Sequence, residues 1–547
     1  MPTLLCVPIL VSDPPAALRD ARAAKDAGAD LVEYRIDDIF HGYESRADEE
    51  AVAQLVEGSP LPCIVTCRSA AEGGQYDGPE EARVSLYQRL GTAEGLTMPP
   101  RYIDVELSAY QSSANIRQKV HLAVGHPVER RELQTSLILS THDFKGRPAD
   151  LSRRVLAMRS VAAAKVLKIA FLARSLRDNL ELFDILADRD RPTIALAMGE
   201  PGLMSRVLAP KFGGFLTFAS LRPTTTTAPG QPTIHELLGT YRFRSIDANT
   251  AVYGVVGAPV SHSLSPHIHN AGFEAAGVNA VYLPLPIPEG FEPFKATLLE
   301  LAHAPALTLR GLSVTIPHKE NLVRLAREKG WELDEASEAI GAANTLAIDR
   351  NDAGAATRLR VLNTDAPALA ASLGAELGSL TGARIAIIGA GGVARAAAVG
   401  LSRAGAAVTV FNRHPGRADE LAAALGPRIT AGELGELPGS AWDAVVNCTP
   451  VGMKDGPAAA EAPVSAAEIA SRSPGAVMMD TVYNPQETRL IREARGAGLR
   501  VVPGLPMFIA QAAAQFSVWT GRPAPAALFE RIARERLESE SPTGPRP

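Results

Sequence analysis

The sequence has little of what marks secreted, membrane or nucleic-acid-binding proteins. Its four cysteines form neither a Cys-x-x-Cys pair nor a zinc-binding spacing, which argues against a disulfide framework and predicts buried thiols in a cytoplasmic protein. No apolar run approaches the roughly 20 residues of a membrane span, and the first ten residues carry no basic signal-peptide region. A net charge of −5 gives no electrostatic basis for binding nucleic acid or an anionic membrane. We therefore expect small-molecule partners.

The remaining composition is that of a globular protein, with 46% hydrophobic and 21% charged residues. A chain of 547 residues is too long for one hydrophobic core, so roughly two to four domains are expected. Composition leaves both a monomer and a homodimer open. His262, His267 and His269 lie close together in the sequence, but their spacing matches no familiar site, and no metal is expected.

Apolar, β-rich runs recur through the first 220 residues and alternate with helical patterns such as Ala16–Ala27 and Leu151–Ala164. Eight strands alternating with helices predict a parallel (β/α)8 TIM barrel, and the length suits one. A doubly wound sheet is the alternative. The strands are expected at Leu4–Leu10, Leu31–Ile36, Cys63–Cys67, Tyr102–Leu107, Leu137–Thr141, Val166–Phe171, Thr193–Met198 and Phe215–Ala219.

Polar residues fall near the C-terminal ends of these strands, where a barrel carries its chemistry. Glu33, Arg35, Arg68 and His142 lie there, although a charged residue at a strand end is often a surface ion pair and a single histidine is often structural. Lys168 is harder to explain in this way, because it lies inside an apolar strand, where an unpaired ammonium costs several kcal/mol to bury. A buried lysine beside cationic groups becomes a nucleophile for a carbonyl, and His142 is placed to move protons. The pair predicts Schiff-base chemistry.

Six motifs stand in order along residues 1–243: EYRID, TCRSAAEGG, STHDF, KIA, MG followed by SR, and APGQ. Together they resemble type I 3-dehydroquinate dehydratase. The resemblance implies that Lys168 forms an imine with the ketone of 3-dehydroquinate, that His142 moves the protons, and that Glu33 orients and tunes His142. No metal is needed, because the imine is the electron sink. The substrate contacts that the resemblance implies are Arg35, Arg68, Arg206, Gln231 and Thr227, the last near the place where the family commonly has a serine.

The segment Arg222–Pro232 can be interpreted in two ways. By composition it is a linker, whereas the resemblance makes it the substrate lid of the barrel. The next segment, Thr233–Tyr241, is predicted as the last barrel helix with Thr233 as its N-cap. This order places the linker between the two halves of the chain at residues 244–250.

Residues 384–417 predict a dinucleotide-binding unit. The apolar strand Ile385–Ile388 runs into a glycine turn and an alanine-rich helix, and a second strand follows at Val408–Phe411. Gly389 permits the tight turn, Gly391 lets the backbone approach a pyrophosphate, and Ala394 allows close packing of helix on strand. The first turn of the helix then offers backbone amides to the phosphates.

The end of the second strand indicates which dinucleotide is bound. NAD-binding versions carry an acid there, whereas this chain has Asn412 and Arg413, followed by Arg417. Guanidinium groups bind a 2′-phosphate in a fork, so the residues favour NADP. A solvated basic loop is the alternative.

Further motifs follow in order in the second half: GAPVSHSLSPHIHN, TIPHK, GAANT, NTD, GAGGVAR and a helix that contains Gln511. Over nearly all of residues 251–537 they resemble shikimate dehydrogenase. The resemblance implies that Lys319 and Asp365 are the catalytic pair and supply the proton to the reduced carbonyl. The substrate contacts that it implies are Ser263, Ser265, Thr315, Asn344, Tyr483 and Gln511. The NADP contacts that it implies are Gly389, Ala390, Gly391, Gly392, Val393, Asn412, Arg413, Arg417, Thr449, Thr481 and Gly504.

The motifs also depart from the family pattern. Ser313 stands where the family often has asparagine, and His414 stands where a threonine often contacts the phosphate. Retention of Ser263, Ser265 and Thr315 favours shikimate over quinate as the substrate.

The whole sequence thus predicts a bifunctional enzyme that dehydrates 3-dehydroquinate and then reduces the product to shikimate with NADPH. An aldolase-type barrel fused to another NADP dehydrogenase is the enzymatic alternative. A ligand-sensing relative is the non-enzymatic one, and the presence of Lys168, His142, Lys319 and Asp365 argues against it. The predicted domains are the barrel 1–243, the linker 244–250, a substrate lobe 251–365 with returning helices 506–537, an NADP-binding Rossmann lobe 366–505, and a disordered tail 538–547.

Overall fold

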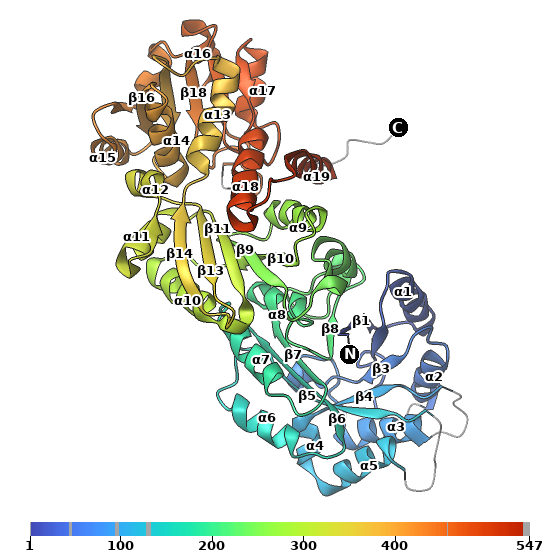
Figure 1. The fold of residues 1–547 in the computed structure, drawn as a ribbon. Coiled ribbons are helices and arrows are strands. Elements are labelled where there is room, and N and C mark those ends of the chain that lie inside the picture. The colour runs from blue at the N-terminus through green and yellow to red at the C-terminus, as the bar shows by residue number, and fades with distance from the viewer. Residues whose placement is uncertain (1, 43–45, 93–97, 127–132, 457, 540–547) are drawn as a thin grey trace. The chain divides into compact units, whose positions relative to one another are not determined.

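The computed structural model describes residues 2–42, 46–92, 98–126, 133–456 and 458–539 (Figure 1). The chain separates into two compact units, Met1–Thr250 and Ala251–Pro547. Among the residues described, none of the helices is long and apolar enough to cross a membrane.

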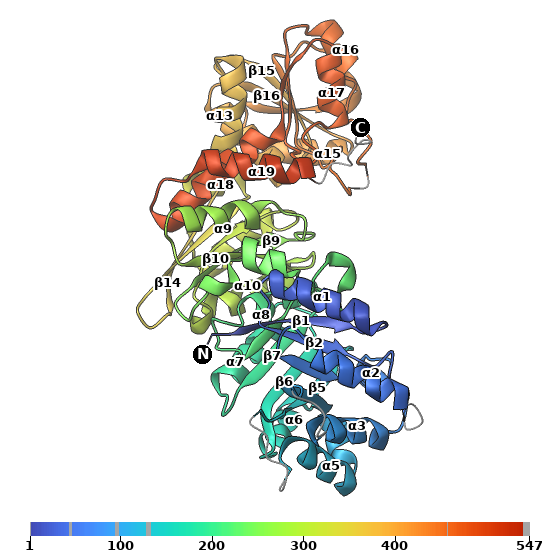
Figure 2. The ribbon, with the colours of Figure 1, turned by 90° about the vertical axis from the view of Figure 1, so that its right-hand side faces the viewer.

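The first unit is a ring of parallel strands with helices on its outside (Figures 1 and 2). The strand order is β7-β6-β5-β4-β3-β2-β1-β8, and a hydrogen bond of 2.8 Å from Phe215 N to Thr193 O joins the two ends of this order. The predicted (β/α)8 barrel is therefore confirmed. Its strands are β1 (Leu4–Leu10), β2 (Leu31–Arg35), β3 (Cys63–Thr66), β4 (Tyr102–Glu106), β5 (Ser136–Asp143), β6 (Ala164–Leu172), β7 (Thr193–Met198) and β8 (Leu216–Phe218).

The barrel helices largely follow the predicted patterns. They are α1 (Pro14–Asp26), α2 (Arg46–Glu57), α3 (Glu80–Thr92), α4 (Leu107–Ser112), α5 (Ala114–Val124), α6 (Leu151–Arg159), α7 (Asp178–Ala187) and α8 (Leu203–Val207). The predicted helix Leu151–Ala164 was too long, because β6 already pairs with β5 at Ala164 and this pairing overrides the helical preference of the alanines. A short helix of the π type covers Glu236–Thr240, and the Thr233 hydroxyl accepts a hydrogen bond from Glu236 N at 3.2 Å, as expected of an N-cap.

The barrel interior is built in layers, because side chains of a strand alternate between its two faces. Cys6, Leu31, Ile64, Tyr102, Ile138, Val166, Ile194 and Leu216 form one buried apolar cluster. Two residues further along the strands, the same face carries Glu33, Thr66, Asp104, Ser140 and Lys168, all of them buried. Two residues further again it carries Arg35, Arg68, Glu106 and His142. An apolar floor thus supports two polar layers toward the C-terminal ends of the strands.

The second unit begins with a mixed sheet in the order β10-β9-β11-β13-β14-β12. Its strands are β9 (Ala251–Gly257), β10 (Ala280–Pro286), β11 (Leu309–Val314), β12 (Glu332–Leu333), β13 (Thr345–Arg350) and β14 (Ala356–Leu362). β13 runs antiparallel to both of its neighbours, β11 and β14. The helices of this lobe are α9 (Ser265–Ala275), α10 (Phe291–His303), α11 (Lys319–Lys329) and α12 (Glu335–Ile340).

The second sheet of this unit is entirely parallel, in the order β17-β16-β15-β18-β19-β20. Its strands are β15 (Arg384–Ile388), β16 (Ala407–Asn412), β17 (Ile429–Glu433), β18 (Ala444–Asn447), β19 (Val477–Asp480) and β20 (Arg500–Val502). Its helices are α13 (Asp365–Leu377), α14 (Gly392–Arg403), α15 (Pro415–Leu425), α16 (Ala466–Arg472) and α17 (Arg489–Gly496). The strand order reverses between β15 and β18, which is where doubly wound sheets bind ligands.

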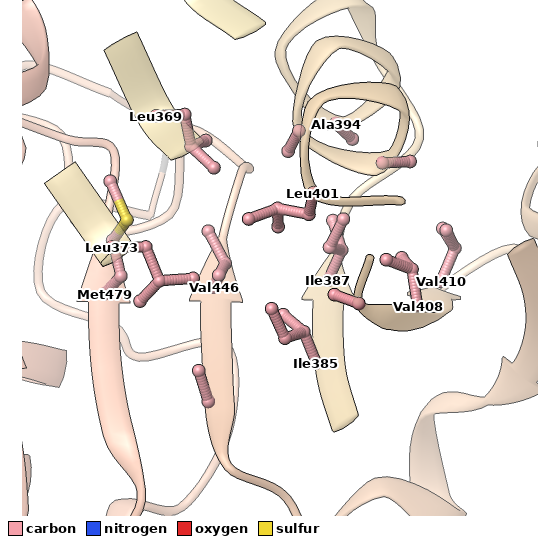
Figure 3. Packing of buried hydrophobic residues seen from close by; sticks show 14 of the residues in the cluster. Leu369, Leu373, Ile385, Ile387, Ala394, Leu401, Val408, Val410, Val446 and Met479 are labelled. Carbon is pink, nitrogen blue, oxygen red and sulfur yellow. The ribbon is translucent and has the colours of Figure 1, made fainter. Parts of the chain in front are cut away.

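One face of this parallel sheet forms a continuous core (Figure 3). Leu369 and Leu373 of α13 and Leu401 of α14 point onto the strands, where they meet residues such as Ile387 and Val446. All of these side chains are fully buried. The packing holds the start of α14 close above the end of β15 and thereby fixes the glycine turn between them.

Two C-terminal helices, α18 (Gly504–Thr520) and α19 (Ala526–Ser539), pack on the first lobe of the second unit. Phe516 and Phe529 are buried against Phe273 of α9, and Figure 2 shows α18 and α19 beside α9. The predicted disordered tail 538–547 was wrong for Glu538 and Ser539, which continue α19 because Leu537 anchors its last turn in the core. The rest of that predicted tail lies outside the described residues.

Candidate active sites

A pocket opens at the C-terminal ends of the barrel strands. Its volume is about 530 Å³ when the open space at its mouth is included. The barrel residues predicted from the sequence all line it: Glu33, Arg35, Arg68, His142, Lys168, Arg206, Thr227 and Gln231. Because Thr227 and Gln231 belong to the wall, the segment Arg222–Pro232 is part of the barrel site rather than a free linker.

Lys168 lies at the bottom of this pocket, with 8% of its side chain exposed. Its Nζ is 3.2 Å from Glu33 Oε1 and 3.0 Å from Asp104 Oδ2, and it lies 4.6 Å from the centre of the Phe218 ring. Burial alone would raise the pKa of Asp104, but Arg68 and Lys168 outweigh it and hold that pKa well below its usual range. The amine is therefore paired by carboxylates below and open to the pocket above.

His142 is held by Glu72, a residue of the motif TCRSAAEGG to which the sequence assigned no role. Glu72 Oε2 is 3.0 Å from His142 Nδ1 and accepts a hydrogen bond from His142 N at 2.9 Å. Burial, with help from Arg68 and Lys168, lowers the pKa of His142 well below its usual value. The ring is therefore neutral at pH 7 and can accept a proton. Burial also raises the pKa of Glu72 to about 7.

The prediction that Glu33 orients His142 was wrong. Glu33 accepts hydrogen bonds from Thr66 Oγ1 at 2.8 Å and from Lys168 Nζ. The layering explains the difference, because Glu33 shares a layer with Lys168, whereas His142 points inward two residues further along its strand. Glu72 lies in the turn Ala70–Glu72 that follows β3, at the height of His142.

Among the described residues that line this pocket, Arg206 is the cation without a carboxylate partner. It is 2% exposed, its Nε has no hydrogen-bond partner among the described residues, and burial lowers its pKa to about 10. Gln231 Nε2 is likewise unpartnered within the described chain, while Gln231 Oε1 accepts from Thr227 N at 2.9 Å. A buried guanidinium without an anion is a strong site for a ligand carboxylate. Arg35 and Arg68 differ, because Asp37 and Asp104 already hold them.

In the second unit, Lys319 is the first residue of α11 and Asp365 is the first residue of α13, and their side chains are in contact. Lys319 Nζ lies 2.6 Å from Asp365 Oδ2, and both side chains are buried. Asn344 Nδ2 donates to Asp365 Oδ1 at 2.9 Å and lies 3.4 Å from Gln511 Oε1. The sequence predicted these four residues from separate motifs, and the fold brings them into one cluster.

The other predicted substrate contacts lie at strand ends of the same unit. Ser263 Oγ accepts a hydrogen bond from Ser265 N at 3.2 Å in the loop between β9 and α9. Thr315 follows β11, and its backbone amide donates to Val256 O. Tyr483 follows β19 and stacks on Phe508, with ring centres 4.4 Å apart. Hydroxyl groups are thereby presented from several loops at the ends of the strands.

The glycine turn after β15 has the geometry of a phosphate cradle. Gly389 has φ +118°, which favours glycine, and a Cβ at Gly391 would meet no protein atom within 4 Å, so the space before α14 is open. Ala394 is fully buried, which accounts for its small side chain. A Cβ at Gly392 would approach Lys319 Cβ to 3.0 Å. The residues thus fit a pyrophosphate at the N-terminus of α14, beside Lys319.

Arg413 and Arg417 are exposed at the end of β16 and the start of α15. Neither forms an ion pair with another residue of the described ranges. Asn412 Nδ2 donates to His414 O at 3.3 Å and so shapes the turn between them. The two guanidinium groups are free to take an anionic group at this end of the sheet.

A buried asparagine that the sequence reasoning did not assign connects the predicted cofactor residues of two further strands. Asn447 Oδ1 accepts hydrogen bonds from Thr449 N and Oγ1, and its backbone oxygen accepts from Thr481 Oγ1 at 2.9 Å. Its Nδ2 donates to Asp480 Oδ1 at 3.0 Å. Thr449 and Thr481 are therefore fixed relative to each other. Its position at the end of a buried strand is the sequence signal that could have identified Asn447 as part of this site.

Asp480 makes the stability of this unit depend on pH. Burial raises its pKa to about 6, from 3.8, so the penalty of burying its charge is complete above pH 6 and disappears as the pH falls below about 3.8. Asp480→Asn can keep the bonds from Asn447 and Val482 at its amide oxygen, and its NH₂ group can donate to the Thr488 hydroxyl, all without the charge. We expect this variant to gain about 1 to 2 kcal/mol in unfolding free energy at pH 8, and less as the pH approaches 4.

Urea unfolding followed by tryptophan fluorescence measures this effect, because Trp331, Trp442 and Trp519 all lie in the second unit. An equal gain at pH 8 and pH 4.5 would show that the buried charge is not its cause.

Comparison with known proteins identifies both halves. Residues 5–248 match the model for type I 3-dehydroquinase. Residues 255–346 match the shikimate dehydrogenase substrate binding domain, 371–456 match shikimate / quinate 5-dehydrogenase, and 504–534 match the shikimate 5′-dehydrogenase C-terminal domain. Over 553 aligned residues the chain is 34% identical to the bifunctional 3-dehydroquinate dehydratase/shikimate dehydrogenase of Arabidopsis thaliana, a chloroplastic protein; the alignment covers 97% of this chain and 84% of that one.

The chain belongs to the bifunctional 3-dehydroquinate dehydratase/shikimate dehydrogenase family. It is an enzyme of the shikimate pathway with both activities, and the aldolase and ligand-sensing alternatives are thereby set aside. The second half is also 38% identical over 305 residues to the NADP(+)-type shikimate dehydrogenase of Moorella thermoacetica, covering 54% of this chain and 97% of that one.

Two solved structures are also similar to this chain. The structure described as dehydroquinate dehydratase and shikimate dehydrogenase from S. pombe AroM is 25% identical in sequence. The match covers 97% of this chain and 98% of that one, with a TM-score of 0.41. A shikimate dehydrogenase from Thermus thermophilus, solved with NADP(H) and shikimate, is 34% identical over 52% of this chain and 99% of its own, with a TM-score of 0.44.

Proposed function

We propose that the barrel dehydrates 3-dehydroquinate through an imine at Lys168. The Nζ attacks the ketone carbon, and water leaves as the C=N bond forms. His142 takes the proton from the carbon beside the imine, the electron pair moves to expel the ring hydroxyl, and the hydroxyl takes the proton back from His142 and leaves as a second water. Hydrolysis of the imine releases 3-dehydroshikimate and restores the amine. The supporting observation is a buried, carboxylate-paired Lys168 open to the same pocket as the neutral His142.

Arg206 is proposed to bind the carboxylate of the substrate, since it is the cation of the pocket without an anion. Gln231 and Thr227 close the pocket from the last loop, and Arg35 and Arg68 face the ring hydroxyls. Glu72, rather than Glu33, is proposed to keep His142 in place during proton transfer. Glu33 and Asp104 instead balance the charge of Lys168 before the imine forms.

For the second unit, we propose that Lys319 donates the proton that the carbonyl oxygen of 3-dehydroshikimate needs when it becomes a hydroxyl. Asp365 orients Lys319, and Asn344 fixes Asp365. Gln511, Ser263, Ser265, Thr315 and Tyr483 hold the ring acid, and the hydroxyl groups of the two serines and Thr315 favour shikimate over quinate. The cofactor that the glycine turn fits is NADPH, which supplies the hydride. Its contacts are proposed at 389–393, Asn412, Arg413, Arg417, Thr449, Thr481 and Gly504.

The proposed domains keep the sequence-based boundaries, with the linker at 244–250. This linker is not loose on the barrel side. Lys211 Nζ donates to Ala248 O and to Thr250 O, each at 2.9 Å, and Ile246 and Thr250 are buried. The linker is therefore tied to the barrel along most of its length.

Consumption of NADPH after addition of 3-dehydroquinate alone tests the whole proposal, because that signal requires both activities and the stated cofactor. Borohydride added with 3-dehydroquinate should inactivate the dehydratase and increase the mass of the peptide that contains Lys168. A reduced adduct on another peptide would reject the imine assignment.

Cofactor choice is tested by Arg413→Ala combined with Arg417→Ala. Because charge-assisted bonds to a 2′-phosphate are lost, we expect KM for NADPH to increase roughly ten- to a hundredfold while KM for NADH changes little. Arg428→Ala is the matched control, since Arg428 is exposed just before β17, at the opposite end of the parallel strands. Equal effects on NADPH and NADH would contradict the assignment.

A further inference from the structure

The charged contacts of Lys168 continue beyond the pocket, through the barrel wall. Asp104, which pairs with Lys168, also accepts from Arg68 Nη2 at 2.8 Å. Arg68 Nη1 donates to Glu106 Oε1 at 3.0 Å, and Glu106 Oε2 lies 2.5 Å from Nη1 of Arg83 on α3. The contacts thus join the catalytic amine to a helix outside the strand ring.

Each side chain of this series is buried. The exposed fraction is 3% for Arg68, 0% for Asp104, and 1% for Glu106 and Arg83. Arg83 is fixed further by a hydrogen bond of 2.6 Å to Cys67 O, and Glu106 accepts from Ser69 N at 3.1 Å. Arg83 also pairs with Glu80, whose side chain is 38% exposed and so lies partly in solvent. With Lys168 and Glu33, the buried part of the series holds three cations and three carboxylates, so its formal charge is balanced.

We propose that Arg83 and Glu106 are positioning residues that set the pH range in which Lys168 reacts with the substrate ketone, by completing the charge balance of the barrel interior. This inference rests on the proposed imine at Lys168. Neither residue lines the pocket, so neither contacts the substrate. They act through Arg68 and Asp104, whose positions they fix.

The direction of each effect follows from charge. Without Arg83, the interior carries one excess negative charge, which favours the ammonium form of the amine and delays attack to higher pH. Without the charge of Glu106, the interior carries one excess positive charge, which has the opposite effect. Salt screens buried charges only weakly, so the pH at which half of the Lys168 amine reacts should move by about half a unit or more in each variant.

Other charged or titratable groups also face Lys168, and they stay unchanged in these variants. They are Cys6 on β1, Glu33 and Arg35 on β2, Arg68 and Glu72 after β3, Asp104 on β4, His142 on β5 and Arg206 on α8. Because these groups are the same in the wild type and in each variant, a difference between their pH profiles comes from the substituted residue.

The test measures borohydride trapping of 3-dehydroquinate on the full chain as a function of pH, read by intact mass. We expect the midpoint of trapping to move to higher pH in Arg83→Met and to lower pH in Glu106→Gln. The double variant is neutral again and should return toward the wild-type midpoint. Arg83→Lys keeps the positive charge, so its midpoint should lie much closer to that of the wild type than the midpoint of Arg83→Met does.

Arg191→Met is the matched control. Arg191 donates to the carbonyls of Val161 and Ala164 in the same barrel but lies outside the charged series, so its loss should lower stability without moving the midpoint. Shifts in the same direction for Arg83→Met and Glu106→Gln, or no shift in either, would overturn the inference. If the wild-type chain forms no adduct at any pH, the imine proposal itself fails instead.

Discussion

Lys168→Arg should lower dehydration of 3-dehydroquinate by about 10⁴-fold or more, while reduction of 3-dehydroshikimate continues at the wild-type rate. A guanidinium keeps the positive charge beside Glu33 and Asp104 but cannot form the imine. Lys168→Met should lose the same activity and also stability, because it leaves two buried carboxylates without their cation. Assays with each substrate separately measure the two activities.

The matched control is Lys165→Met, since Lys165 lies on the same strand but is exposed. It should leave both activities unchanged. Residual dehydration in Lys168→Arg above about a hundredth of the wild-type rate would exclude an obligatory imine at this position.

Lys319→Met should lower kcat for reduction of 3-dehydroshikimate by about 10²- to 10³-fold, the usual contribution of a positioned proton donor. Its Nζ is the partner of Asp365 at 2.6 Å, and Asn344 already holds the other carboxylate oxygen. Removing the amine therefore leaves the carboxylate oriented but takes away the group that is proposed to donate the proton. Steady-state kinetics with saturating NADPH measures the loss, and dehydration in the barrel should stay unchanged.

Lys329→Met, at the exposed end of the same helix α11, is the control for Lys319. It changes the charge of the helix without touching the site. A Lys319→Met enzyme with kcat within threefold of the wild type would show that the proton comes from another group.

Much of the barrel site could be predicted because strand alternation is a local rule. Once Val166 is taken as inward-facing, Lys168 must face inward too, and the same reasoning applied to Tyr102 indicates Asp104, which was overlooked. The apolar runs of the strands made the barrel itself predictable, since only buried parallel strands need such composition.

The partners within the site could not be predicted in this way. Glu72 reaches His142 from a turn 70 residues earlier in the chain, and no periodic pattern relates the two positions. Glu33 was given the wrong partner because the sequence shows that both side chains point inward but not at which height. The predicted C-terminal end of α6 was wrong for a similar reason, because the pairing of β6 with β5 decides where the helix ends.

In the second unit, separate short motifs predicted Lys319, Asp365 and Asn344, yet the link through Asn447 was missed. Thr449 and Thr481 belong to different strands, and their relation depends on the register of β18 and β19. Register between distant strands follows from packing of the whole sheet rather than from any local pattern.

Gly392 has a consequence for how this unit can vary. Its missing side chain lets the turn proposed to hold the phosphates lie directly against Lys319, the proposed proton donor. The proposed cofactor and substrate compartments therefore share a wall in which an added methyl group would lie 3.0 Å from Lys319 Cβ, so that Lys319 would have to shift to admit it. Any replacement that reshapes one compartment at this point must be tolerated by the other as well, which narrows the routes by which this half of the chain could acquire a new specificity.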